Sequence, residues 1–141
     1  MGCDIHFHIE VKVNGSWEHY GSPDINREYN VFAILGNVRG GEHGTFIPVS
    51  DHRGIPEDAT IITKMCYEDI ADDAHGMSYI DRNEFHILQE RLNKLNGSDP
   101  SHDLEYHLLH TYLMGNSFEY AEYKSNLYEL EDVRFIFWFD N

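Results

Sequence analysis

The sequence predicts an α+β fold, in which a small, largely antiparallel sheet packs against three to four helices. Three features predict it: strict alternation of apolar and polar residues over 3–13, an Asn14-Gly15 pair that follows it, and an aromatic, β-branched run at 133–139. The 141 residues are expected to form one domain, 1–141, because a chain of this length can bury a core without disulfides or metals.

The alternation at the start of the chain predicts a β-hairpin. Residues of one phase are apolar and are expected to face the core: Cys3, Ile5, Phe7, Ile9, Val11 and Val13. Residues of the other phase are ionisable and line the opposite face: Asp4, His6, His8 and Glu10. Asn-Gly then predicts a two-residue turn into a second strand over 17–20. The run at 133–139 is apolar on both faces, so we expect an interior strand beside this hairpin.

Between these ends, the apolar spacing predicts helices over 25–35, 56–66, 81–95 and 101–114. The stripe Ile61, Ile62, Met65 and Cys66 is expected to face the core in the second helix, although 60–63 also fits a strand. Residues 75–80 read as a short strand or loop, and 37–56 and 116–132 as irregular segments.

Charge excludes one class of partner. Twenty-five acidic residues against ten basic ones give a formal net charge of −15, which repels duplex nucleic acid. No apolar run approaches the roughly 18 residues that span a bilayer, so we expect no membrane partner and a cytoplasmic location. Two cysteines without a Cys-x-x-Cys pair support neither a disulfide framework nor a thiolate zinc site, and both thiols are expected in the core.

The ionisable face of the first strand has three interpretations. His6 and His8 lie about 6.5–7 Å apart along a strand, so they could share a divalent metal such as zinc or manganese if His75 supplied a third ligand. Asp73 or Asp140 are alternative third ligands. With a metal bound, Asp4 or Glu10 could serve as the catalytic base, and without a metal His6 and His8 could act as catalytic acid and base. The third interpretation is a solvated strand face without chemistry.

A second set of residues suits a pocket for a small anionic ligand. Arginines in Gly-rich segments and on the last strand can pair with phosphate or carboxylate, and aromatic rings can stack on a flat group. The candidate ligand-binding residues are Arg39, Arg53, His75, Ser78, Tyr79, Asn116, Arg134 and Trp138. For any single arginine an internal ion pair is the commoner role, and for a single Trp or Tyr a place in the core.

Several segments carry a resemblance that spans most of the chain. They are the opening Met-Gly-Cys-Asp-Ile-His, residues 27–35, Arg53-Gly54-Ile55-Pro56, Gly115-Asn116-Ser117-Phe118 and the ending Val-Arg-Phe-Ile-Phe-Trp-Phe-Asp-Asn. The sequence resembles a family of small uncharacterised proteins of tailed bacteriophages and prophages. The resemblance implies expression in the cytoplasm of an infected bacterium and brings no established activity with it.

Three functions follow as hypotheses. The first is a phage accessory protein that binds a small anionic, nucleotide-derived ligand and sequesters a host defence signal. The second is a phosphodiesterase-like hydrolase that uses the strand histidines with or without a divalent metal. The third is a non-catalytic interaction module, and the aromatic content is compatible with a homo-oligomer.

Overall fold

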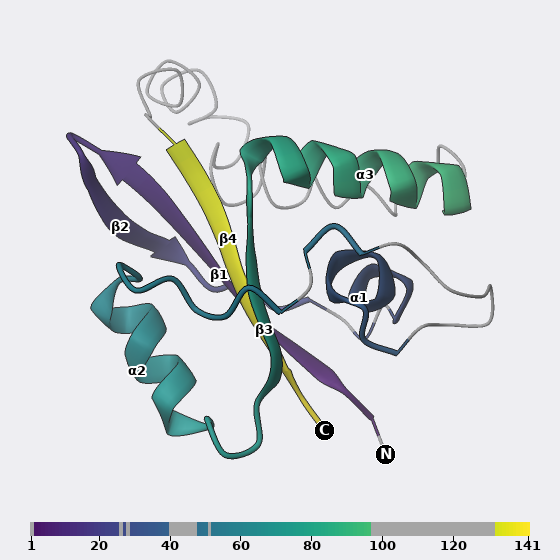
Figure 1. Ribbon diagram of the computed structural model, residues 1–141, viewed down its shortest axis with the longest axis horizontal. Helices are drawn as coiled ribbons and strands as arrows, with labels where there is room; N and C mark the ends of the chain where they lie inside the picture. Colours follow the sequence, from purple (N-terminus) through teal and green to yellow (C-terminus); the bar gives the residue numbers. More distant parts are fainter. Residues whose placement is uncertain (1, 26, 28, 40–47, 51, 97–131) are drawn as a thin grey trace.

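The computed structural model describes residues 2–25, 27, 29–39, 48–50, 52–96 and 132–141. Its elements, in chain order, are β1 (Asp4–Val13), β2 (Ser16–Gly21), α1 (Tyr29–Gly36), α2 (Ile61–Asp69), β3 (His75–Asp81), α3 (Arg82–Asn96) and β4 (Asp132–Asp140). The strands form an antiparallel sheet in the order β2-β1-β4-β3 (Figure 1). An α+β fold is therefore confirmed. The helix expected over 101–114 lies outside the described residues.

The predicted hairpin and interior strand are both present. Asn14 and Gly15 have φ values of 51° and 79°, as a two-residue type I′ turn requires, and Val13 pairs with Ser16 directly beside them. β4 pairs with β1 along its whole length and with β3 on its other side, so it is interior. Residues 75–81 form the strand β3 rather than a loop.

Layers of helix cover both faces of the sheet. α1 and α3 lie on one face, where the odd-numbered residues of β1 pack against Phe135, Phe137 and Phe139 of β4 (Figure 1). α2 and the segment before it lie on the other face, where Tyr67 and Ile70 pack against Ile136 and Trp138. The ionisable row of β1 faces this second layer. His8 is only 3% exposed and Glu10 is fully buried, so the interpretation as a solvated face is wrong for these two residues.

The helix boundaries follow local capping. α1 begins at Tyr29, later than expected, and ends at Gly36, one residue beyond the expected range. Asp81 and Glu84 form a capping box at the start of α3, with N···O distances of 3.1 and 2.8 Å. α2 begins at Ile61, later than expected, because Thr60 is its N-cap. Its expected inward stripe is wrong: Ile61, Ile62, Met65 and Cys66 are exposed. Among the described residues, no helix combines the length and apolar character needed to cross a membrane.

Candidate functional site

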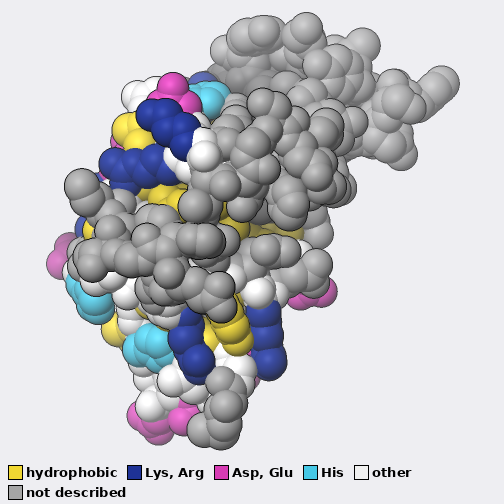
Figure 2. Space-filling view, turned by 90° about the vertical axis from the view of Figure 1, so that its right-hand side faces the viewer, with side chains coloured by type: hydrophobic (Ala, Val, Ile, Leu, Met, Phe, Trp, Pro, Cys, Tyr) yellow, Lys and Arg dark blue, Asp and Glu magenta, His cyan; other side chains and the backbone are white. Residues whose placement is uncertain are grey.

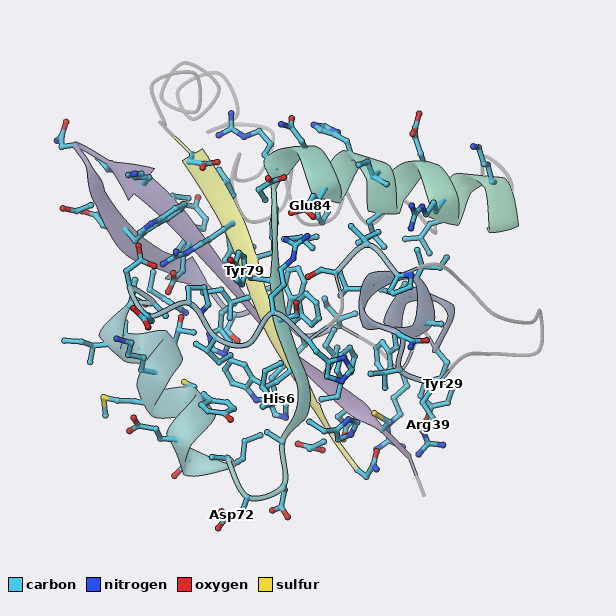
Figure 3. All side chains as sticks on the ribbon, viewed as in Figure 1. His6, Tyr29, Arg39, Asp72, Tyr79 and Glu84 are labelled. Atoms are coloured by element: carbon cyan, nitrogen blue, oxygen red, sulfur yellow. The ribbon has the colours of Figure 1, made fainter. Side chains whose placement is uncertain are left out.

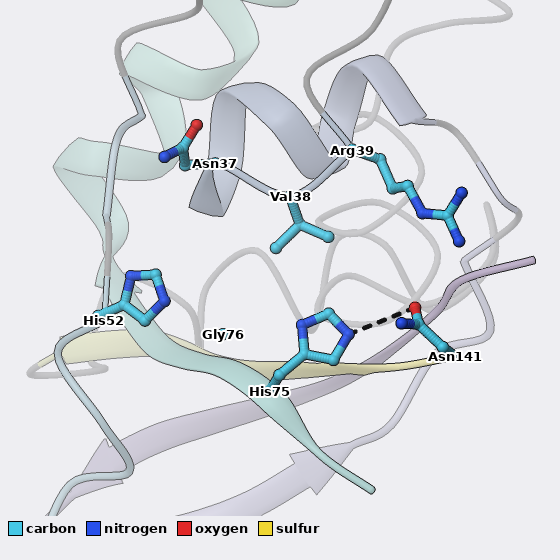
Figure 4. Close-up of a pocket in the computed structure, with 7 residues that line it drawn as sticks. All are labelled: Asn37, Val38, Arg39, His52, His75, Gly76 and Asn141. Carbon is cyan, nitrogen blue, oxygen red and sulfur yellow. Dashed lines mark hydrogen bonds between the residues drawn. The ribbon is translucent and has the colours of Figure 1, made fainter.

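A pocket of about 280 Å³ lies where the chain leaves α1, where β3 begins and where β4 ends (Figure 4). Its walls are formed by Asn37, Val38, Arg39, His52, His75, Gly76 and Asn141. A guanidinium, two imidazoles and two carboxamides therefore line one hollow. These groups supply N–H donors for an oxyanion, and the pocket lies on the same face of the sheet as α1.

Backbone hydrogen bonds at the end of α1 place the first wall. Asn37 has φ of 60° and donates its N–H to the Ala33 carbonyl at 3.0 Å, which is the left-handed stop of a helix. The N–H of Val38 then bonds to the Phe32 carbonyl at 3.2 Å. This turn directs the chain into Val38 and Arg39, beside the start of β3.

The second wall, which carries His52, is fixed along β3. Ser50 Oγ lies 2.5 Å from Ser78 Oγ and donates to the Tyr79 carbonyl at 2.8 Å. Downstream, Gly54 N–H bonds to the Met77 carbonyl at 2.9 Å. His52 therefore projects from a segment that is tied to the sheet on both sides.

Two pocket residues adopt a backbone conformation that is unfavourable for them. Four described residues other than glycine have positive φ: Asn14, Asn37, Arg39 and His52. The two asparagines are explained by the hairpin turn and the helix stop. Arg39 (φ 52°) and His52 (φ 57°) belong to neither of these two features, and both line the same pocket. Left-handed backbone at bulky residues costs of order 1–3 kcal/mol each and concentrates at functional sites.

Glycine is required at the floor of the pocket. Gly76 has φ of 65°, and a Cβ there would lie 2.9 Å from Phe139 Cδ2 and 3.2 Å from Val38 Cγ2. The β3–β4 register shifts between His75 and Ser78. Because of this bulge, the side chains of His75 and Ser78 lie on the same face of the sheet, the one that α1 covers. His75 stacks on Phe139, with ring centroids 6.1 Å apart, and its Nε2 lies 3.4 Å from Asn141 Oδ1.

Arg39 is the cation of this site. It lies beside Tyr29, with its guanidinium carbon 5.5 Å from the ring centroid (Figure 3). Burial raises the pKa of the Cys3 thiol, and the Arg39 guanidinium opposes that rise. Figure 2 shows Lys, Arg and His side chains close together in the lower half of the face it presents. Asp or Glu side chains lie below and beside them in the same view.

The histidines of β1 lie on the other face of the sheet. His6 Nε2 is 2.6 Å from Asp140 Oδ2, and both imidazoles stack on Trp138, with centroids 5.8 Å away for His6 and 4.8 Å for His8. His8 Nδ1 is 3.0 Å from His19 Nε2. Burial lowers the pKa of His8 to about 4, and it lowers that of His19 as well.

The predicted metal set of His6, His8 and His75 is not assembled, because the sheet separates His75 from the other two. Within the described ranges, no group of three His, Cys, Asp or Glu side chains is placed to hold a metal ion. Asp4, the third predicted catalytic residue, forms an exposed ion pair with Arg27, which lowers the pKa of the Asp4 carboxyl.

Arg134, predicted to bind the ligand, instead joins a buried network. It contacts Glu10 and Asp58, each at 2.7 Å. Glu10 also accepts hydrogen bonds from Thr60 Oγ1 at 2.6 Å and Thr63 Oγ1 at 2.7 Å. Burial opposes the ionisation of Glu10, but these donors outweigh it and hold the pKa below its usual value. The network attaches α2 to the sheet.

The remaining predicted ligand-binding residues also have structural partners. Arg53 forms a two-point ion pair with Glu84 and donates to the Tyr79 carbonyl at 3.1 Å. Ser78 is hydrogen-bonded to Ser50, and Trp138 is fully buried and stacks with His6 and His8. Asn116 lies outside the described residues. Of the predicted set, the pocket brings together Arg39 and His75.

The pocket also contains residues outside the list of candidate ligand-binding residues. His52 and Gly76 lie in two segments, 51–54 and 75–79, that the sequence favours for a pocket. Asn37 follows the predicted end of the first helix, and Asn141 has no distinguishing local signal. Comparisons with protein-family models, with curated proteins and with solved structures gave no match.

Proposed function

We propose that the protein binds a small anionic ligand in the pocket formed by Arg39, His52 and His75. The observation that carries this proposal is the left-handed backbone of Arg39 and His52, which are the two described residues other than glycine with positive φ outside the hairpin turn and the end of α1. Both residues line the same hollow. A cationic pocket on a chain of net charge −15 favours recognition by short-range pairing, because the long-range field repels anions.

The size of the pocket narrows the ligand class. A volume of about 280 Å³ is near the lower limit of about 300–1,000 Å³ for small-molecule sites. It suits a phosphate or carboxylate on a compact scaffold, up to about one mononucleotide. Tyr79 and Trp138, expected to stack on a base, belong to the cluster on the opposite face of the sheet. We retain a nucleotide-derived phosphate, sequestered in a phage-infected bacterium, as the specific form of the proposal, and the sequence resemblance is its support.

Calorimetric titration tests the proposal directly. We would titrate the protein with inorganic phosphate, AMP and a cyclic dinucleotide, and repeat the titration with Arg39→Ala and His75→Ala. Loss of a charge-assisted hydrogen bond should weaken binding about 10–100-fold in Arg39→Ala. Lys94→Ala and His86→Ala, which remove an exposed cation and an exposed imidazole from α3, are the matched controls. Absence of binding to every probe, or equal binding by Arg39→Ala, would contradict the proposal.

One observation favours a second candidate function, a metal-independent hydrolase. The carboxylate of Asp140 holds the partly exposed imidazole of His6 at 2.6 Å, as in sites where a carboxylate orients a general base. This candidate predicts turnover of a chromogenic phosphodiester that chelator does not affect. Activity should fall at least 100-fold in His6→Ala and remain in His75→Ala.

A further inference from the structure

α2 presents its apolar side to solvent. Ile61 is 75% exposed, Ile62 is 53% exposed and Met65 is 63% exposed. These are the three most exposed large apolar side chains of the described residues, and they follow one another on a single helix at positions i, i+1 and i+4. Single exposed apolar residues are ordinary, whereas a contiguous group marks an interaction surface.

The fold prevents α2 from burying this group by rotating. Thr63, on the opposite side of the helix, is fully buried and donates to Glu10 at 2.7 Å. Tyr67 packs edge-on against Trp138, with ring centroids 5.4 Å apart. Rotation would leave the Glu10 carboxylate without these donors, at a high cost for a buried charge. The side of α2 that carries Thr63 and Tyr67 is therefore fixed against the sheet.

Acidic residues lie at both ends of the exposed face. They are Glu57, Glu68, Asp69, Asp72 and Asp73, together with Asp58, which already pairs with Arg134, against the single cation Lys64 within 57–73. Asp72 lies in the turn after α2, at the extremity of the molecule (Figure 3). Glu68 and Asp69 stand in the last turn of α2, which has no basic residue. Carboxylates at the negative end of the helix dipole are unfavourable, and a cation placed there would relieve the repulsion.

We propose that this face of α2 binds a protein segment that is amphipathic and basic. Apolar side chains of the partner would pack on Ile61, Ile62 and Met65, and flanking Lys or Arg side chains would pair with the acidic residues at the two ends. A second copy of this chain does not fit. In an antiparallel pair of α2 helices the acidic N-terminal approach of one copy would oppose the acidic C-terminal turn of the other, between molecules of net charge −15.

A pair of designed peptides tests the proposal. One is a helical peptide of leucine and lysine, and the other has the same leucine positions with glutamate in place of lysine. We expect fluorescence anisotropy to detect binding of the lysine peptide alone. The double variant Ile61→Asn/Met65→Gln should weaken that binding at least tenfold, and Ile87→Asn, at an exposed apolar residue of α3, should leave it unchanged.

Charge reversal provides a second, independent readout. Glu68→Lys/Asp69→Lys should reduce binding of the lysine peptide at least tenfold, and thermal unfolding of each variant checks that the fold is retained. If the wild type and Ile61→Asn/Met65→Gln bind the lysine peptide equally well, the binding depends on net charge alone and the proposal is overturned. Sedimentation equilibrium that shows a dimer dependent on Ile61 and Met65 would assign the surface to a second copy and overturn it as well.

Discussion

Because the backbone of His52 is left-handed, we expect glycine at this position to be more stable than alanine, which reverses the usual order. At an ordinary exposed position, glycine is less stable than alanine by about 0.5–1 kcal/mol, because its unfolded chain has more freedom. At a left-handed position, alanine instead bears a steric cost of about 1–2 kcal/mol that glycine avoids. For φ of 57°, the difference leaves His52→Gly more stable than His52→Ala by about 0.5–1 kcal/mol.

The comparison isolates the backbone, since both variants remove the same imidazole and all of its contacts. In a domain of roughly this size, 1 kcal/mol shifts the melting temperature by about 2–4 °C, so differential scanning calorimetry should find His52→Gly about 1–4 °C above His52→Ala. The matched control is Glu90, an exposed residue within α3, where the glycine variant should melt below the alanine variant.

The same two variants connect strain with binding. If the conformation serves a ligand, both His52→Gly and His52→Ala should lose affinity for the anion, although one of them gains stability relative to the other. The reasoning is refuted if glycine is less stable than alanine at His52 by the same margin as at Glu90. In that case the left-handed conformation would not be a property of the folded protein.

Three further predictions concern the framework. Gly76→Ala should destabilise the protein by about 1–3 kcal/mol in chemical denaturation, because its Cβ would press on Phe139 at a positive φ; an unchanged midpoint would contradict the described approach. Glu10→Gln leaves Arg134 with Asp58 as its remaining carboxylate. We therefore expect the free energy of unfolding to fall by up to the value for breaking a buried ion pair, about 3–5 kcal/mol. An unchanged free energy of unfolding would show that the network is not buried. The pKa of His8 is lowered to about 4, so the unfolded chain takes up protons first as the pH falls below 6.5. Stability should therefore fall between pH 6.5 and 4, by at most about 1.4 kcal/mol per pH unit for this group, and His8→Phe should flatten the profile. A profile that is unchanged in His8→Phe would assign the slope to other groups.

The sheet was predictable because its signals are local. Alternation, an Asn-Gly turn and a terminal apolar run each act over eleven residues or fewer, and each correctly predicted its part of the sheet. The two-residue turn also fixes the hairpin register, so the pairing of Glu10 with His19 follows from counting outward from Asn14-Gly15. The count therefore places His19 on the same face as His8, two residues along β1 from it.

The second layer was also implicit in the last strand. Ile136 and Trp138 are apolar and alternate with the core-facing Phe135 and Phe137, so an interior β4 needs cover on both faces. Any element that covers Trp138 also covers the neighbouring residues of β1. Burial of His8 therefore follows from the apolar residues on both faces of β4. Alternation within β1 alone cannot show whether the polar face of that strand contacts water or a second layer of the protein.

The pocket was not predictable at the level of single residues. Arg39 carries no local signal for positive φ, and His52 carries only the general preference of histidine for this region. Their conformation depends on hydrogen bonds between segments far apart in the chain, such as Ser50 with Ser78. Arg53 was predicted to bind the ligand because of its charge, but it pairs with Glu84. Its neighbour His52 lines the pocket instead.

The orientation of α2 shows how a distant charge can override periodicity. The spacing of Ile61, Ile62 and Met65 defines an amphipathic helix, and its apolar side would normally face the sheet. Glu10 reverses this, because a buried carboxylate needs donors, and Thr60 and Thr63 provide them from 50 and 53 residues away. Glu10 determines which side of α2 remains in water, so Glu10→Gln should weaken binding of the lysine peptide as well as the stability of the fold. Arg39 lies on the opposite face of the sheet, so Arg39→Ala should weaken binding of the anion alone.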